Sequence, residues 1–441
     1  MSSRPDRRVV STPAHHDRGG GVPAPPGGAD APIGAVPADP PGGWPIVAVL
    51  SVTQTVGYGV LYYAFAVLPP SMRRDLHTGT AQITAALTLA LLVSAFAAVP
   101  VGRHLDAHGG RALMTAGSLL GTLAVIAWAS VQNLWQLYAV FILIGLASAM
   151  ALYEAAFAVV VAWFHHRRAT ALLAVTIVAG FASTIFMPLT GWLVDDHGWR
   201  TALLVLAALH GAVTIPLHLL VRRPPAAADQ PAENTASAAA ADTAAERDTV
   251  TRAALRDPVF WTLGAVFVAH GAAVAVIGVH LVTYLTELGH PAAFAAAITG
   301  LPGILSVSGR LVTTAAARRT STAGAAAAVF ALQAAAALAL PAIGATTAGA
   351  IACVLAFGLG FGVGTIARPA LLADTYGTTA YATISGLLNL PLLIAKATMP
   401  LAAAAARNIT GTYTPVAVAT AFCCALAATG LFAVHRLTTR P

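Results

Sequence analysis

Charge is the property that this sequence has least of. Only 9% of the 441 residues are charged, whereas 57% are hydrophobic, and the mean hydropathy is +0.75. A soluble domain carries about 25% charged residues, and no soluble core could take up this much apolar sequence. The composition therefore excludes a soluble protein and predicts a polytopic membrane protein whose main partner is the lipid bilayer.

Lysine and cysteine are also scarce. Lys396 is the single lysine beside 23 arginines, and the cysteines, Cys353, Cys423 and Cys424, lie inside apolar runs. Their spacing fits neither a disulfide framework nor a metal site, so no metal or other cofactor is expected. The net charge of +7 would suit nucleic acid. The basic residues lie in short loops, however, which membrane topology explains better, so we expect no nucleic-acid partner.

Twelve apolar runs, most of them about 20 residues or longer, cover the chain after residue 43, and each can cross a ~30 Å hydrocarbon core. They lie near 45–70, 79–101, 111–130, 134–163, 169–194, 200–221, 259–286, 292–316, 322–341, 347–373, 381–404 and 413–435. The polar segment 222–257 separates six runs from six, as in two parallel repeats.

These boundaries predict the domain organisation. Residues 1–43 have no signal-peptide core and are expected to be a disordered cytoplasmic tail. Six-helix bundles are expected at 44–221 and 258–436, joined by a cytoplasmic linker at 222–257, and a short tail follows at 437–441.

The loop charges predict the orientation. With the N-terminus inside, 17 basic residues lie in cytoplasmic segments and 4 in external loops, which satisfies the positive-inside rule. Both termini are therefore predicted to be cytoplasmic.

One short polar stretch, GRHLDAHGGR at 102–111, connects the second and third apolar runs. Its glycines permit a tight turn. The Asp106 carboxylate can cap the N-terminus of a neighbouring helix, where the helix dipole favours negative charge. Arg111 is expected to pair with Asp106.

This stretch resembles the G-x-x-x-D-x-x-G-x-R signature between helices two and three of the major facilitator superfamily. Gly102, Asp106, Gly109 and Arg111 match it, whereas Ala107 and Gly110 stand where the family usually has basic residues. The resemblance implies an all-α membrane protein with twelve transmembrane helices in two six-helix pseudo-symmetric bundles. It also implies that these four residues form a cytoplasmic gate that holds the outward-facing state.

Further segments look like bacterial relatives of the monocarboxylate and oxalate/formate porters. They are EAAFAVV from Glu154, WFHHRR from Trp163, AGFASTIFMP from Ala179, GWR from Gly198 and HLVTYL from His280. In those porters an arginine in helix eight and a lysine in helix eleven bind carboxylates. The resemblance thus implies that Arg310 and Lys396 bind substrate in the inner membrane of a bacterium. Ser306 stands where the monocarboxylate porters have an aspartate, four residues before the arginine.

The residues themselves point to an anionic solute. Ionisable side chains inside spans are costly and are candidates for function. The predicted spans contain one acid, Glu154, and three bases, Arg310, Arg368 and Lys396. Glu154 and Arg368 could carry a coupling proton or form a structural charge pair, and Arg310 could bind substrate or anchor its helix at the inner surface. His280 and Tyr62 could be cavity donors or packed polar residues.

The predicted function is secondary transport by alternating access, with proton symport or anion exchange of a small organic anion such as a monocarboxylate. We expect a monomer. Proton-coupled efflux of drugs or secondary metabolites is the alternative, although Gly180 and Pro188 fit the usual efflux signature poorly. An intramembrane enzyme or sensor is more remote, because the spans contain no acid/base pair, metal set or Ser/His couple, and no sizeable soluble domain is predicted.

Overall fold

The structure is a computed structural model that describes residues 39–40, 42–224, 236–299 and 301–438. The predicted tails therefore lie largely outside the described residues, as does part of the predicted linker. Over the described residues the chain is built from helices and contains no strand.

The N-terminal half contains α1 to α8 and one 3₁₀ turn. Their bounds are α1 Gly43–Leu61, η1 Tyr63–Ala66, α2 Pro69–Leu76, α3 Thr80–His108, α4 Gly110–Ala129, α5 Leu134–Ala151, α6 Tyr153–Trp163, α7 Arg168–Ala179 and α8 Ala182–Leu219. The helix α9, Ala236–Arg256, lies in the predicted linker.

The C-terminal half contains α10 to α17. Their bounds are α10 Pro258–Glu287, α11 Ala292–Thr299, α12 Leu301–Ala317, α13 Thr322–Ile343, α14 Thr347–Gly358, α15 Val363–Tyr376, α16 Tyr381–Thr410 and α17 Thr414–Thr438.

These helices account for twelve membrane crossings. Ten segments in the described chain are long and apolar enough to span a membrane. One of them, Arg168–Leu219, contains two crossings, because Gly198 (φ 78°, ψ 159°) interrupts α8 with a backbone conformation that glycine tolerates. Helices α11 and α12 on either side of Gly300 form the remaining crossing. The predicted fold, two six-helix bundles of transmembrane helices, is therefore confirmed.

Two matching crossings, one in each half, are broken near their middle. The fourth crossing changes from α5 to α6 at Leu152, whose backbone is extended, and Glu154 lies in the first turn of α6. The tenth changes from α14 to α15 through a glycine-rich turn that ends at Gly362, and Arg368 lies in α15. The first break sets Glu154 next to non-helical backbone, and Arg368 lies in the second turn of α15.

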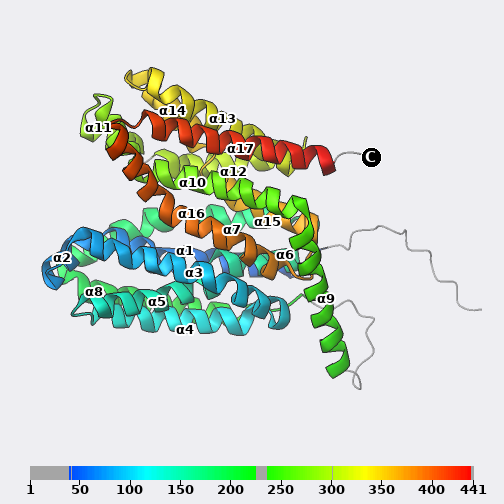
Figure 1. The fold of residues 1–441 in the computed structure, drawn as a ribbon. Coiled ribbons are helices and arrows are strands. Elements are labelled where there is room, and N and C mark those ends of the chain that lie inside the picture. The colour runs from blue at the N-terminus through cyan, green and yellow to red at the C-terminus, as the bar shows by residue number, and fades with distance from the viewer. Residues whose placement is uncertain (1–38, 41, 225–235, 300, 439–441) are drawn as a thin grey trace, which may run out of the picture. The chain divides into compact units, whose positions relative to one another are not determined.

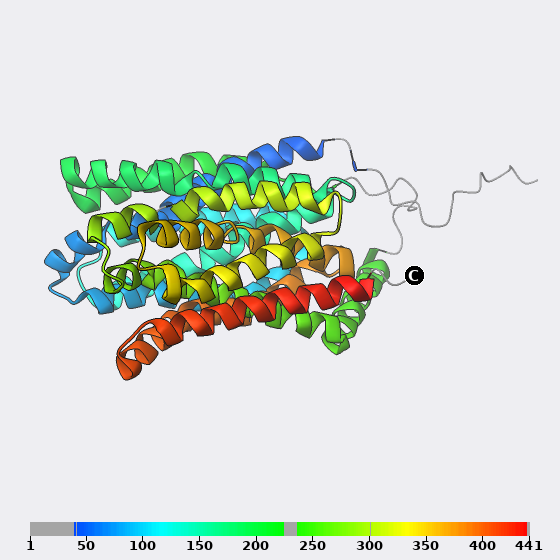
Figure 2. The ribbon, with the colours of Figure 1, turned by 90° about the horizontal axis from the view of Figure 1, so that it is seen from above.

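The helices run between two ends of the bundle (Figures 1 and 2). We call the end that carries α9 the α9 end, and the opposite end, which carries α2 and α11, the far end. The most extensive contact between the halves is α3 against α16, drawn in blue and orange in Figure 1. Glycine permits it: a Cβ on Gly102 would collide with the backbone of Ala382, and one on Gly386 with the backbone of Ala98.

Candidate functional site

A polar cluster at the broken helices joins the two halves. Glu154 accepts a hydrogen bond and forms an ion pair with Arg368, and its second carboxylate oxygen accepts from the Ser385 hydroxyl at 3.0 Å. Arg368 also donates to the Asn389 side chain. The side chains of the pair are 9% and 21% exposed for Arg368 and Glu154. Helices α6, α15 and α16 are thus connected through one buried charge pair.

Arg310 is the second buried cation. It lies on α12, is 8% exposed, and donates from Nη1 to the Thr176 carbonyl at 2.6 Å and from Nε to the Gly362 carbonyl at 3.3 Å. Thr176 lies in the last turn of α7 and Gly362 precedes α15, so both carbonyls lie at helix breaks. The contact to Thr176 crosses between the halves.

Three tyrosines of the N-terminal half lie near this guanidinium. Tyr58, Tyr63 and Tyr153 lie close enough to Arg310 to interact with it electrostatically. The rings of Tyr58 and Tyr153 pack with centroids 4.5 Å apart. A guanidinium has five N–H donors and Arg310 uses two of them in the described chain, so three remain for another acceptor.

Lys396 lies on α16 beside the charge pair rather than beside Arg310. It interacts electrostatically with Arg368 and Glu154. Its side chain packs against Gly271, because a Cβ added to that glycine would lie 3.2 Å from the Lys396 Cε. Within the described chain its ammonium has no hydrogen bond or ion pair. The two cations that the sequence placed in one site therefore lie on separate helices, and only Lys396 interacts with the Glu154–Arg368 pair.

Asp106 caps the N-terminus of α16, a helix of the other half. One carboxylate oxygen accepts from the Ala382 N–H at 3.0 Å, and the other from the Thr383 N–H at 2.8 Å and the Thr383 hydroxyl at 2.6 Å. This is the capping contact expected from the 102–111 stretch, and the helix that Asp106 caps is α16. Gly102 lies against the same turn of α16, and Gly109, at φ 78°, ends α3.

The expected Asp106–Arg111 pair is wrong. Arg111 is exposed and has no ion pair among the described residues. Both oxygens of Asp106 accept hydrogen bonds from the three donors of α16. The basic residue that contacts the 102–111 stretch is Arg223, which follows α8. It donates to the Ala107 carbonyl and packs against Gly109.

Two more polar contacts fasten the α9 end. Arg168 at the start of α7 pairs with Asp374 on α15 at 2.9 Å, again between the halves. Asp39, ahead of α1, accepts from the N–H groups of His165, His166 and Arg167. Partial burial raises the pKa of the Asp39 carboxyl, but these backbone donors outweigh it, and the pKa is lowered.

The two remaining predicted site residues have no contact with the charged side chains among the described residues, although Tyr62 packs on Tyr63, one of the tyrosines beside Arg310. His280 lies on α10. Its Nδ1 is 3.0 Å from the Tyr413 hydroxyl oxygen, and its Nε2 is 2.9 Å from the Pro400 carbonyl oxygen. Both ring nitrogens therefore have partners within the C-terminal half. Tyr62 ends α1, is 38% exposed and packs on Tyr63 at 5.2 Å between ring centroids.

Sequence reasoning missed several members of the site. Tyr153 directly precedes Glu154, and Ser385 and Asn389 lie four residues apart on α16. This spacing places the last two on one helix face, a signal that was present in an otherwise apolar run. In the described part of the chain, no three His, Cys, Asp or Glu side chains are grouped as metal ligands would be.

Solved structures share this fold. The chain is 17% identical to the E. coli fucose:proton symporter FucP (N162A variant), with a TM-score of 0.67 over 90% of this chain and 98% of that one. It is 16% identical to the human organic anion transporter MFSD10 (TETRAN), with a TM-score of 0.65 over 90% and 99%. The proton:xylose symporter XylE gives 10% identity and a TM-score of 0.68 over 89% and 95%.

No curated protein matches the chain. The family model described as Major Facilitator Superfamily, however, matches residues 50–400, which include the 102–111 stretch, Glu154, Arg310, Arg368 and Lys396. Members of this family are transporters and not enzymes. The chain therefore belongs to the major facilitator superfamily, as a multi-pass membrane protein built for secondary transport.

Proposed function

We propose that this chain carries a small organic anion, a monocarboxylate or related carboxylate, by proton symport or anion exchange. The observation that supports this most is Arg310. It is buried at the junction of the halves, it has three N–H donors uncommitted in the described chain, and it faces three tyrosines of the opposite half. A planar fork of donors in that position matches a carboxylate.

The charge balance supports the same substrate class. Glu154 and Arg368 neutralise one another, so Arg310 and Lys396 remain as cations without an acidic partner in the described chain. A charge in a membrane span costs roughly 2.5–3.5 kcal/mol on insertion scales. An anionic solute bound between them would offset this cost for as long as it stays. We expect a monocarboxylate to use mainly Arg310 and a dicarboxylate to engage Lys396 as well.

The polar contacts suggest how access alternates. Asp106, Glu154 and Arg168 each bond across the two halves toward the α9 end. We propose that this end faces the cytoplasm and that the structure is the outward-facing or occluded state. Glu154 would take up the coupling proton, which would release Arg368 and loosen this end. Exchange of anions without a proton is the other form of coupling that the same cluster allows.

The similar structures bear on this proposal only in outline. FucP and XylE are described as proton symporters of sugars, and MFSD10 as an organic anion transporter. At 10–17% identity these likenesses show the fold alone. The anionic substrate therefore depends on the cations of this chain.

The test is uptake and counterflow of a panel of mono- and dicarboxylates by purified protein in proteoliposomes, with and without a pH gradient. We expect saturable carboxylate transport that Arg310→Ala removes and Arg310→Lys restores only in part. Lys396→Ala should impair a dicarboxylate more than a monocarboxylate. The matched control is Arg318→Ala, an exposed arginine one residue beyond the end of the same helix, which should transport like the native chain.

Two results would count against the proposal. One is carboxylate binding of native strength in the Arg310→Ala, Lys396→Ala double variant. The other is saturable transport of only neutral or cationic compounds by the native chain, which would favour proton-coupled efflux or neutral-solute symport instead.

A further inference from the structure

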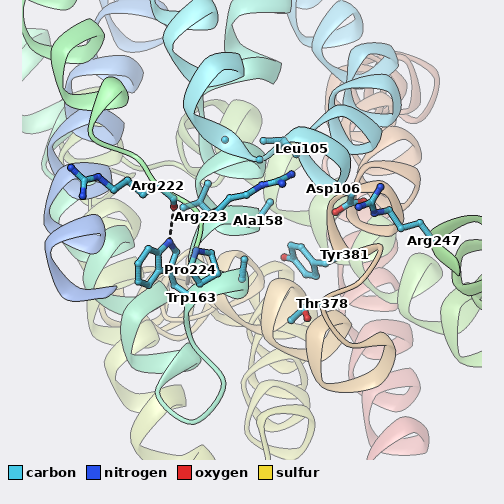
Figure 3. Close-up of a pocket in the computed structure, with 14 residues that line it drawn as sticks. Leu105, Asp106, Ala158, Trp163, Arg222, Arg223, Pro224, Arg247, Thr378 and Tyr381 are labelled. Atoms are coloured by element: carbon cyan, nitrogen blue, oxygen red, sulfur yellow. Dashed lines mark hydrogen bonds between the residues drawn. The ribbon is translucent and has the colours of Figure 1, made fainter. Parts of the chain in front are cut away.

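A cavity of about 250 Å³ opens at the α9 end, outside the Arg310 site (Figure 3). Its walls come from both halves and from the helix between them. The N-terminal half contributes α3, α4, α6 and residues 222–224, the linker contributes α9, and the C-terminal half contributes Thr378 and the first turn of α16. A molecule in this cavity would therefore touch three parts of the chain at once.

Positive charge in this cavity exceeds negative charge. Arg223 and Arg247 lie on either side of Asp106 in Figure 3, whereas the guanidinium of Arg222 points away from the group. Both oxygens of Asp106 already accept hydrogen bonds from α16. Arg223 uses one donor on Ala107, and the Arg247 guanidinium has no hydrogen bond or ion pair within the described chain. Most of these guanidinium donors are therefore available to an acceptor.

A buried hydroxyl adds a second, independent sign of a ligand. Tyr381 lines the cavity and is only 3% exposed; its hydroxyl lies near the Ser385 hydroxyl and Glu154 but makes no hydrogen bond of good geometry among the described residues. The Ser385 hydroxyl, one helical turn further on, donates to Glu154 instead. In Figure 3 the Tyr381 hydroxyl points toward the middle of the lining residues. Buried polar groups are rarely left unpaired, because their desolvation is then uncompensated.

We infer that this cavity binds a phosphate-bearing anion that regulates transport. Arginine forks match phosphate oxygens, and the tyrosine hydroxyl supplies a further donor. The apolar walls, Leu105, Val159 and Trp163, leave room for an organic group attached to the phosphate. The shared chemistry is a phosphate ester, which could be a soluble metabolite or the headgroup of an anionic phospholipid.

The effect on transport follows from the position of the cavity. Its walls belong to both halves, so they come together only while the α9 end is closed. A ligand that binds the closed state better than the open one shifts the population toward it. The bound phosphate ester therefore slows turnover without competing for the carboxylate site.

The test is equilibrium binding to the full chain, measured by calorimetry with glycerol phosphate as the soluble probe, in nanodiscs of zwitterionic lipid. A parallel arm uses nanodiscs that contain phosphatidylglycerol. Saturable binding in the first arm supports a soluble ligand. A lipid headgroup is supported if glycerol phosphate no longer binds in the nanodiscs that contain phosphatidylglycerol, or if phosphatidylglycerol binds and glycerol phosphate does not. No saturable binding in either arm overturns the inference.

Variants locate the binding. Arg247→Ala should weaken it by roughly tenfold or more, as expected for a charged hydrogen-bond donor. The matched control, Arg222→Ala, removes a neighbouring arginine that points away and should leave binding unchanged. Equal effects of the two substitutions would show only general charge attraction and contradict the site. Arg310→Ala should keep full binding; a loss there would move the ligand to the carboxylate site and overturn the inference.

Tyr381→Phe separates a ligand role from a structural one. Removing an unpaired buried hydroxyl should raise the unfolding temperature without glycerol phosphate and weaken binding of the probe. If stability and binding fall together, the hydroxyl is structural and the cavity loses its second donor. Because the readout is binding, failure of the carboxylate proposal would not affect this result.

Discussion

The two ends of the bundle are held together in different ways. From the middle of the bundle to the α9 end, polar contacts run between the halves: Glu154 to Arg368, Asp106 to α16 and Arg168 to Asp374. At the far end, the polar contacts that we describe stay within one half. Trp199 donates to Asp75 at 2.7 Å in the N-terminal half, and Arg407 pairs with Glu287 at 2.6 Å in the C-terminal half.

The apolar packing shows the same difference. One core contains only residues of the N-terminal half, including Leu68 and Trp199 near the far end, and another contains only residues of the C-terminal half. The two remaining cores mix the halves: Val161 packs into C-terminal residues, and Ala370 and Ala382 into N-terminal ones. A rocking motion can therefore keep the far-end cores intact, whereas at the α9 end it must break bonds between the halves.

The largest expected effect comes from breaking the buried pair between the halves. Arg368→Ala removes the ion-pair partner of the half-buried Glu154, whose electrostatic interaction with Lys396 remains, and should lower the free energy of unfolding by about 3 kcal/mol. Denaturant unfolding of the purified protein measures it. The double variant Glu154→Gln, Arg368→Ala should recover part of the loss, because the carboxylate that lost its ion-pair partner is then removed. A double variant as unstable as Arg368→Ala would show that packing, and not charge, is lost.

Glu154→Gln alone tests whether the pair also moves a proton. The amide cannot take up and release a proton, so pH-gradient-driven accumulation should disappear while exchange of anions continues. Uptake and counterflow in proteoliposomes measure the two modes separately. If gradient-driven accumulation is intact in this variant, Glu154 is a structural residue.

Asp106→Asn weakens the cap on α16 and should act on the closed end rather than on binding. A capping carboxylate at a helix N-terminus contributes about 1–2 kcal/mol. The loss should change the balance between closed and open α9 ends by roughly tenfold and slow turnover, with similar substrate affinity. Transport rates and equilibrium binding check this together. A large loss of affinity with normal turnover would contradict the gating role.

Asp39 should give a small effect that appears only in acid. Its pKa is lowered in the folded chain, so its stabilising contribution is present above the unfolded value of 3.8 and is lost as pH falls through the lower folded value. Asp39→Asn should therefore flatten the stability–pH curve below about pH 4 and reduce stability slightly at pH 7. Thermal unfolding across this range checks it. If the stability of the variant falls with pH below about pH 4 as steeply as that of the native chain, the contacts of Asp39 contribute nothing to stability.

The smallest effect is expected at the far end. Arg407 and Glu287 are 39% and 29% exposed and belong to one half, so Arg407→Ala should cost less than about 1 kcal/mol. Transport should stay close to native because no bond between the halves is lost. An Arg407→Ala variant as impaired as Asp106→Asn would erase the difference between the ends.

Much of the fold could be predicted, because hydrophobic runs report membrane crossings directly. The break at Leu152 could not, since no proline or glycine marks it, and it is this break that starts a new helix at Tyr153. Asp106 was recognisable as a capping residue, yet its partner lies 276 positions away on α16, and local reasoning chose Arg111 instead. Sequence shows which groups need partners; tertiary packing decides which partner each one finds.

The same limit applies to the candidate site. Glu154, Arg310, Arg368 and Lys396 stand out because charges are rare in apolar runs. His280 stands out for the same reason, but its two partners, Tyr413 and the Pro400 carbonyl, lie 133 and 120 positions away. Tyr153 carries no charge and gave no comparable signal, whereas the four-residue spacing of Ser385 and Asn389 was a weaker signal than a charge.

The most direct test of the account measures distances between the two halves at both ends of the bundle by electron spin resonance. One label pair replaces His104 and Thr379 at the α9 end, and the other replaces Arg74 and Asn408 at the far end, with the three native cysteines changed to alanine. We expect a short, narrow distance at the α9 end in the native chain. Asp106→Asn should lengthen it and shorten the far-end distance in the same sample. If Asp106→Asn leaves the α9-end distance unchanged, or lengthens both, the α9 end is not the gate and the comparison between the ends is wrong.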